Sequence, residues 1–284
     1  MLISPLRYPG GKAKLFEFFA ALVQCNRLFG SIYCEPYAGG AGLALKLLSS
    51  GFVHEVVLND IDQAIWAFWE SALNYPEEIC RLIETTPFTI DEWYKQREIW
   101  REKNVSDVVA LGFSTFFLNR TNRSGIIEGA GPVGGYAQAG RWRLDARFDR
   151  LKQASSIRAL IPYRKQIELR NLDAKDFIAE TLYNPECLTY LDPPYYVKGS
   201  KLYRNSYTHD DHVQIMEAVS ANRAGKWVVS YDDVNPIRSI YEAFSPIQYC
   251  LSYSAGRPGA GSEVIYLSDS LESPELEGFV NFAA

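Results

Sequence analysis

The sequence predicts an α/β fold, in which a Rossmann-like sheet carries helices on both faces and is interrupted by an inserted, mainly helical segment. Three observations support this prediction. Short β-rich apolar runs alternate with helical stretches at both ends of the chain, a glycine-rich turn follows the first run, and a long helical interval separates the second run from the third. The predicted strands are residues 32–36, 55–59, 166–171, 187–191, 226–231, 247–251 and 263–267.

The long interval between the second and third strands differs from the rest of the chain in composition and in the spacing of its apolar residues. It is rich in Trp, Arg and Glu, and its apolar residues recur at helical spacing. Thr89 followed by Glu92 is a capping-box pattern that opens a helix carrying two tryptophans, Trp93 and Trp100, which we expect in the core. We predict one domain made of residues 1–60 and 155–284, and an inserted helical domain made of residues 61–154.

Composition places the chain among globular proteins. Its 284 residues, 47% of them hydrophobic, are enough to bury a full core. A membrane-spanning helix needs about 20 consecutive apolar residues, and no stretch of this sequence approaches that length. The N-terminus carries charge and paired glycines instead of the apolar core of a signal peptide. We therefore expect a cytoplasmic protein. The net charge of −5 disfavours nucleic-acid binding unless a local basic surface compensates for it.

Metal binding is not indicated. The five cysteines are scattered without C-x-x-C spacing, which favours reduced buried thiols over disulfides or a zinc site. The run HDDH at residues 209–212 has the residue types of a metal site, but neither a cysteine nor a third histidine lies nearby. Thr208 and Asp211 instead form the N-terminal capping pattern of a helix over residues 213–221.

The first predicted strand runs into a glycine turn and then a helix. Glycines let the backbone approach a ligand closely, and the N-terminus of the following helix favours polar or anionic groups, so we interpret residues 35–42 as a cofactor cradle. A simple turn at the point where the strand order reverses is the alternative. The candidate cofactor-binding residues here are Glu35, Pro36, Ala38, Gly39 and Gly40.

The second strand ends in Asn59-Asp60, where a carboxylate can accept hydrogen bonds from both hydroxyls of a ribose. A nicotinamide dehydrogenase would carry a similar pair of features. The pattern G-x-G-x-x-G is not met, however, because Leu45 stands at the third glycine position. A dehydrogenase would also need a substrate base or acid that the sequence does not supply.

The motif Asp192-Pro193-Pro194-Tyr195 separates these alternatives. It follows an apolar strand, and the C-terminal ends of parallel strands face the ligand crevice, so Asp192 should point toward the cradle. The prolines stiffen the turn and remove two N–H donors, which leaves carbonyl oxygens and a carboxylate as acceptors beside Tyr195. This set is complementary to the amino group of a flat base taken out of its helix. A Pro-Pro turn that merely ends the strand is the alternative.

These blocks occur in the order found in Dam-type (D12 class, alpha group) DNA adenine-N6 methyltransferases, which the chain resembles over most of its length. Residues 7–12 (RYPGGK) resemble the family's N-terminal cofactor block and residues 35–42 its glycine motif. Asp60 matches the ribose-binding acid, and residues 192–195 match the catalytic DPPY motif. The resemblance implies a Rossmann-like methyltransferase sheet, with the inserted segment as the target-recognition domain.

The resemblance further implies S-adenosylmethionine as cofactor and direct methyl transfer to the amino group. Asp192 and the carbonyl of Pro193 would accept the hydrogens of the amine and stabilise the positive charge that grows on its nitrogen. No dedicated strong base is required. The cofactor contacts implied outside the glycine turn are Tyr8, Lys12, Asp60, Asp192 and either Asp173 or Asp176 near the adenine of the cofactor.

Residues 119–140 are crowded with glycine and polar residues and are long for a connector. Within residues 119–152, six arginines and one lysine stand against three acids, an excess of four positive charges. The segment resembles the hairpin with which the family reads double-stranded DNA, although a solvated surface loop has the same composition. Glu128 stands where GATC-specific members are expected to carry a basic residue, which argues against GATC. The candidate DNA-binding residues are Arg120, Asn122, Arg123, Ser124 and Arg141.

Two alternatives stay open beside adenine N6. Cytosine N4 methylation needs almost the same acceptors, and a catalytically silent protein could bind cofactor and DNA as a regulator. The resemblance over the full chain favours adenine, and the intact motif at residues 192–195 favours catalysis. The sequence leaves open the recognition site, the oligomeric state and whether a companion restriction endonuclease exists.

Overall fold

The computed structural model describes residues 1–7, 12–197, 207–252, 260–277 and 279. In this part of the chain a seven-stranded sheet has the order β3-β2-β1-β4-β5-β7-β6. The strands from β1 to β5 pair in parallel, and β7 runs antiparallel between β5 and β6. All seven predicted strands are confirmed. They are β1 (Ser31–Glu35), β2 (Val53–Asn59), β3 (Ile167–Arg170), β4 (Cys187–Leu191), β5 (Lys226–Asp232), β6 (Ile247–Ser252) and β7 (Ala260–Leu267).

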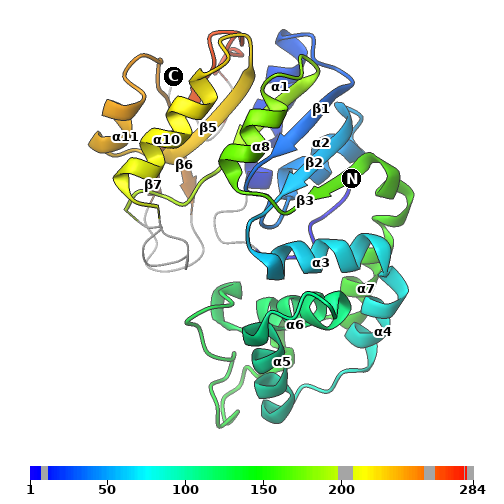
Figure 1. Ribbon diagram of the computed structural model, residues 1–284. Coiled ribbons are helices and arrows are strands. Elements are labelled where there is room, and N and C mark those ends of the chain that lie inside the picture. The colour runs from blue at the N-terminus through cyan, green and yellow to red at the C-terminus, as the bar shows by residue number, and fades with distance from the viewer. Residues whose placement is uncertain (8–11, 198–206, 253–259, 278, 280–284) are drawn as a thin grey trace.

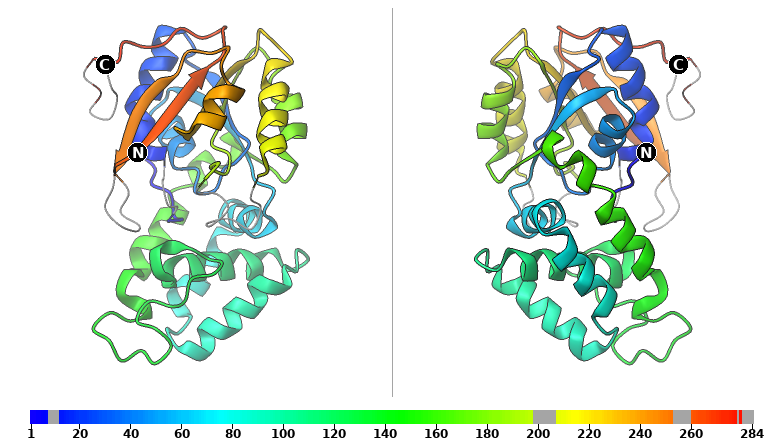
Figure 2. Two further views of the ribbon diagram at one scale, coloured as in Figure 1. Left: turned by 90° about the vertical axis from the view of Figure 1, so that its left-hand side faces the viewer. Right: turned by 90° about the vertical axis from the view of Figure 1, so that its right-hand side faces the viewer.

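Helices cover both faces of the sheet, as the sequence predicts (Figures 1 and 2). On one face lie α1 (Phe16–Cys25) and α2 (Gly42–Ser49), and on the other lie α8 (Ala174–Thr181), α10 (His209–Ser220) and α11 (Asn235–Ile240). Each face has its own hydrophobic cluster. Because side chains alternate along a strand, Val228 and its neighbour Val229 in β5 belong to opposite clusters.

Five helices lie between β2 and β3 and pack together beyond one edge of the sheet (Figure 1). One hydrophobic cluster runs from Tyr33 in β1 to Phe116 in this helical segment, so the two parts share a core. The division into two domains stays a prediction. The helices are α3 (Gln63–Asn74), α4 (Pro76–Thr85), α5 (Ile90–Glu102), α6 (Val108–Thr121) and α7 (Arg150–Arg158).

Both predicted N-caps are present. The Thr89 hydroxyl accepts a hydrogen bond from the Glu92 N–H at 3.1 Å and opens α5, whose Trp93 and Trp100 are buried as expected. The capping box of Thr208 and Asp211 opens α10, which begins at His209, four residues earlier than predicted.

The described residues hold no group of three or more potential metal-ligating side chains, and no described helix is both long and apolar enough to cross a bilayer. Cys34, Cys80 and Cys187 are free and buried, whereas Cys25 is free but exposed, contrary to the expectation of uniformly buried thiols. Cys25 is exposed because it ends α1, where the apolar face of the helix has stopped.

Candidate active site and DNA-facing surface

Three of the predicted acids lie at one edge of the sheet. Because β1 to β4 are parallel, their carboxyl ends share that edge, where Asp60 follows β2, Asp173 precedes α8 and Asp192 follows β4. Burial chiefly raises the pKa of Tyr207 to about 12, and the nearby carboxylates of Asp173 and Asp60 add to the rise. Asp173 therefore lies on the same side as Asp60, whereas Asp176 is exposed in the first turn of α8.

Two side chains, those of Asp60 and Trp69, hydrogen-bond to the backbone of the glycine turn at Gly39. The Gly39 N–H donates to Oδ2 of Asp60 at 2.9 Å, and the indole N–H of Trp69 in α3 donates to the Gly39 carbonyl at 2.9 Å. Gly39 and Ala41 adopt left-handed φ values of 44° and 45°, so the chain turns sharply into α2. The predicted cradle residues Ala38, Gly39 and Gly40 are buried in this turn. Trp69 was not predicted as a residue of this turn, because the helical spacing of its segment indicates only a position in a helix core.

Asp60 is arranged to receive further donors. Its Oδ1 accepts from the Asp62 N–H at 3.0 Å and its Oδ2 from Gly39, which leaves each oxygen a lone pair. Desolvation of this carboxylate raises the pKa of Asp60 to about 7, against the lowering effect of the two backbone donors. Ligand hydroxyls that donate to Asp60 would favour its charged form.

The Asn59 side chain, at the end of β2, hydrogen-bonds to the backbone that follows β1 and β3. Its side chain is 1% exposed, donates to the carbonyls of Pro36 at 3.0 Å and Leu172 at 3.1 Å, and accepts from the Leu172 N–H at 2.8 Å. Both predicted cradle residues at the end of β1 are buried: Pro36 offers its carbonyl to Asn59, and Glu35 accepts from the Tyr33 hydroxyl at 3.1 Å. Burial raises the pKa of Glu35 to about 8.

Lys12 joins the N-terminal block to the DPPY motif. Its Nζ lies 3.2 Å from Oδ1 of Asp192 and donates a hydrogen bond to the Tyr195 hydroxyl. The Ser230 hydroxyl also donates to Oδ1 of Asp192, at 3.2 Å. Burial raises the pKa of Asp192, and the positive charge of Lys12 opposes that rise. The structure thus places Lys12 at the Asp192 carboxylate, which is the candidate acceptor for the amine. Tyr8 lies outside the described residues.

Glu263 is a site residue that the sequence reasoning missed. It is fully buried on β7, where its Oε2 lies 3.1 Å from Nζ of Lys12 and also accepts from the Tyr249 hydroxyl. Its Oε1 has no hydrogen-bond partner among the described residues. An acid at the first position of an apolar predicted strand, residues 263–267, was the available signal, because a buried carboxylate needs a partner.

The segment after the DPPY motif is held by Asp232 at the end of β5. Its two carboxylate oxygens accept from the N–H groups of Tyr196 at 2.9 Å and Val197 at 3.0 Å. The Tyr196 ring packs on α10, 5.1 Å from the His212 ring. Pro193 is buried and Pro194 half-buried in the same turn.

Comparison with known proteins decides the family. The model of the D12 class N6 adenine-specific DNA methyltransferases matches residues 8–250, most of the chain. The protein belongs to this family. It is therefore an adenine-specific DNA methyltransferase.

Other comparisons add no argument. A search of curated proteins finds no match. Among solved structures, protein LPL1258 from Legionella pneumophila is similar at 14% identity, with 92% of this chain and 86% of that chain covered. The TM-score of 0.31 is too low to support any inference from that likeness.

Two residues of the D12 methyltransferase that were expected on the DNA-binding surface are turned inward. Asn122 is 1% exposed, accepts from the Trp93 indole N–H at 2.7 Å and donates to the carbonyls of Ile126 and Ile127. Arg120 donates to the Pro5 carbonyl, and desolvation chiefly lowers its pKa to about 10. Asn122 therefore supports the backbone of the loop from inside, and Arg120 holds the N-terminal segment at Pro5.

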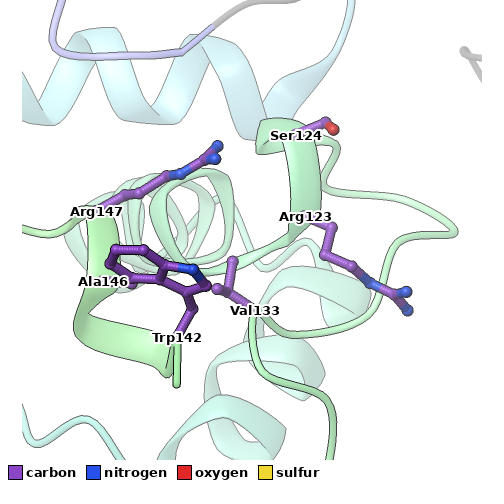
Figure 3. A pocket seen from close by; sticks show the side chains of 6 residues that line it. All are labelled: Arg123, Ser124, Val133, Trp142, Ala146 and Arg147. Atoms are coloured by element: carbon purple, nitrogen blue, oxygen red, sulfur yellow. The ribbon is translucent and has the colours of Figure 1, made fainter. Parts of the chain in front are cut away.

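The remaining predicted residues of the loop lie at its surface. Arg123 and Arg141 are exposed, and Ser124 is half-buried at the rim of a cavity (Figure 3). Other arginines of the helical segment are engaged: Arg150 donates to the Ile83 carbonyl at 2.7 Å, and Arg158 pairs with Glu77. In the part of the chain that the structure describes, no carboxylate pairs with any of four exposed loop arginines, Arg123, Arg141, Arg143 and Arg147.

Proposed function

We propose that this enzyme transfers a methyl group from S-adenosylmethionine to N6 of an adenine that is flipped out of double-stranded DNA. One observation carries the proposal. The cluster of buried Lys12 with half-buried Asp192 and Tyr195 lies at the same sheet edge as the Gly39–Asp60 turn, which is where an acceptor set for an amine and a cradle for a cofactor must meet.

The residues of the turn fit S-adenosylmethionine. Gly39 and Ala41 hold a tight left-handed turn against which a ligand can lie closely, and Asp60 keeps free lone pairs for ribose hydroxyls. Asp173 is the nearer acid for the adenine ring of the cofactor, since it shares the surroundings of Tyr207 with Asp60. When bound, the cofactor supplies an electrophilic methyl group.

Asp192 and the Pro193 carbonyl would orient the target amine. By accepting its two hydrogens they draw the nitrogen lone pair out of conjugation with the ring and stabilise the positive charge that develops during transfer. Ser230 and Lys12 fix the Asp192 carboxylate through contacts of 3.2 Å each. Tyr195 would stack on the flipped base, which limits its motion and excludes water.

The test is product analysis. DNA incubated with the protein and methyl-labelled S-adenosylmethionine is digested to nucleosides and separated by mass spectrometry. We expect labelled N6-methyladenine, no N4-methylcytosine and no label when the cofactor is omitted. Failure to label any DNA, with the protein folded and the cofactor bound, would contradict the proposed reaction.

Cofactor affinity should depend on pH through Asp60. With a pKa of about 7 in the free protein, Asp60 is largely protonated below pH 7 and charged above it. Because ribose hydroxyls donate to the charged form, affinity should rise from pH 6 to pH 8, by up to about tenfold per unit below the pKa. Calorimetric titration measures this.

The Asp60→Asn variant is the control for that dependence. It should bind more weakly at pH 8 and lose most of the rise, while Glu35, whose pKa is raised to about 8, titrates in both proteins. An identical pH profile for the variant and the parent enzyme would remove Asp60 from the ribose site.

The unpaired loop arginines should contact DNA phosphates. Replacing Arg123 and Arg141 together with alanine should weaken duplex binding and lower the slope of log Kd against log salt by about two, one for each lost phosphate contact. Arg81→Ala, which removes an exposed arginine of α4, is the matched control and should leave the slope unchanged. Fluorescence anisotropy at several salt concentrations measures the slope, and a double variant with the parental slope would contradict this assignment.

A further inference from the structure

A cavity of about 480 Å³ opens on the loop side of the helical segment (Figure 3). It is lined by apolar, aromatic and cationic groups. The Trp142 indole and the Val133 side chain form its centre, and Arg147 reaches past the indole toward the N-terminal segment. The complete lining is Arg123, Ser124, Val133, Trp142, Ala146 and Arg147.

Trp142 is unusual among the tryptophans of this chain. The sequence contains six, and only Trp142 is exposed, at 62%, whereas the other five are buried or partly buried. The Arg141 guanidinium lies 5.1 Å from the centre of its ring. An exposed indole flanked by arginine offers a stacking surface for another planar ring, as aromatic side chains do in proteins that bind unstacked bases.

Three arginines lie beside or near the cavity, and none of them forms a salt bridge with a carboxylate among the described residues. Desolvation and the charge of Arg147 lower the pKa of Arg7, and the charge of Arg7 in turn contributes to the lowered pKa of Arg120, so the three guanidinium groups lie within electrostatic range of one another. Nη1 of Arg7 and Nε of Arg120 are buried and have no acceptor among the described residues. Donors of this kind are satisfied by an anion such as a phosphate.

The cavity is preformed by its own hairpin. The Gln138 amide donates to the Val133 carbonyl at 2.7 Å, and its oxygen accepts from the Leu144 N–H at 3.0 Å, which closes the hairpin across its base. At Gly134, with φ of +83°, a Cβ would lie 2.4 Å from the Trp142 carbonyl oxygen, so only glycine permits this approach. A preformed site loses less conformational entropy on binding.

The cavity also lies near the active site along the chain. Asn119 holds Arg7 through two hydrogen bonds of 2.7 Å, to its N–H and its carbonyl. Arg7 is five residues from Lys12, which contacts Asp192, so their Cα atoms are at most about 18 Å apart. DNA with a base in the active site would therefore pass within a few nucleotides of Arg7, at about 3.4 Å per step, and Arg7 is within electrostatic range of the cavity residue Arg147.

We propose that this cavity binds one nucleotide of the DNA substrate other than the target adenine, with its base stacked on Trp142 and its phosphate bound by Arg147 beside Arg7. The proposal rests on the proposed function, because it takes DNA as the molecule that the active site engages. It makes Trp142 and Arg147 determinants of DNA binding, and gives Asn122 and Gln138 the role of supporting the cavity from within the loop.

The test uses the full chain and a mixed-sequence DNA duplex, whose methylation by the parent protein is measured separately. Because Trp142 is the one exposed tryptophan, saturating duplex should change the intrinsic fluorescence of the parent protein and leave that of Trp142→Phe nearly unchanged. Trp142→Ala should raise the Kd for the duplex by about tenfold to a hundredfold without altering the salt slope. Arg147→Ala should lower that slope by about one.

Two matched variants control for surface changes. Tyr183→Ala removes an aromatic side chain that is 65% exposed before β4, at the opposite edge of the sheet, and Arg81→Ala removes an exposed arginine of α4. Both should bind DNA as the parent does. Cofactor affinity and thermal unfolding of every variant, measured in parallel, show that the fold and the cofactor site are intact.

Specific results would overturn the proposal. Duplex affinity of Trp142→Ala equal to that of the parent, with no fluorescence change on saturation, would exclude the cavity as a DNA site. A change produced by dAMP but not by duplex would make it a site for free nucleotides, which also refutes the proposal. If the parent protein shows the fluorescence change but methylates no DNA, the proposed function fails while the cavity assignment stands.

Discussion

Asp192→Asn is expected to lower the single-turnover rate of methyl transfer by at least about a hundredfold, the range seen when one preorganised group that stabilises transition-state charge is removed. The amide keeps the shape of the carboxylate but loses its charge, and its NH₂ group would face the amine instead of accepting from it. Cofactor affinity should change by less than about tenfold, because Asp192 is proposed to hold the amine chiefly.

The environment of Asp192 makes this substitution informative. Its carboxylate is held by Ser230 and Lys12 at 3.2 Å each, and Lys12 keeps a second carboxylate partner in Glu263 at 3.1 Å, so the variant does not leave the lysine unpaired. Asp176→Asn, at an exposed position of α8, is the control and should react at the parental rate. A transfer rate for Asp192→Asn within threefold of the parent would remove Asp192 from the catalytic role.

Asn59→Ala is expected to lower the free energy of unfolding by roughly 3 to 5 kcal/mol, because it leaves three buried backbone groups without partners. These groups are the carbonyls of Pro36 and Leu172 and the N–H of Leu172, which lie where the chain leaves β1 and β3. The same loss should loosen the turn beside Asp60, so cofactor affinity should fall even at temperatures where the variant is folded. Denaturant unfolding and calorimetry measure the two effects.

Asn171→Ala is the matched control for Asn59. It removes the asparagine directly after β3, whose amide donates one hydrogen bond of 2.6 Å to the Asp60 carbonyl at an exposed position. We expect a loss of about 1 kcal/mol or less. Equal destabilisation by the two substitutions would show that the network of Asn59 does not hold the strand ends together.

Local features of the sequence determined the strands, the helix starts and the main site motifs. Periodicity is a property of neighbouring residues, which is why all seven strands and the N-caps at Thr89 and Thr208 could be located. The carboxyl ends of adjacent parallel strands share an edge, so Asp60 and Asp192 could be assigned to one site before any coordinates were known.

Only the tertiary structure decided which distant residues complete the site and which way the loop residues face. Glu263 meets Lys12 across 251 positions of sequence, and Trp69 reaches the glycine turn from a helix that local pattern assigned only to the core. Arg120 and Asn122 have the composition of a DNA-reading loop, but Asn122 turns inward to Trp93 of α5 and Arg120 to the Pro5 carbonyl, while Trp142 is left exposed. The physical reason is that the direction of a polar side chain depends on which buried backbone groups need a partner, and those groups are brought together only when the whole chain has packed.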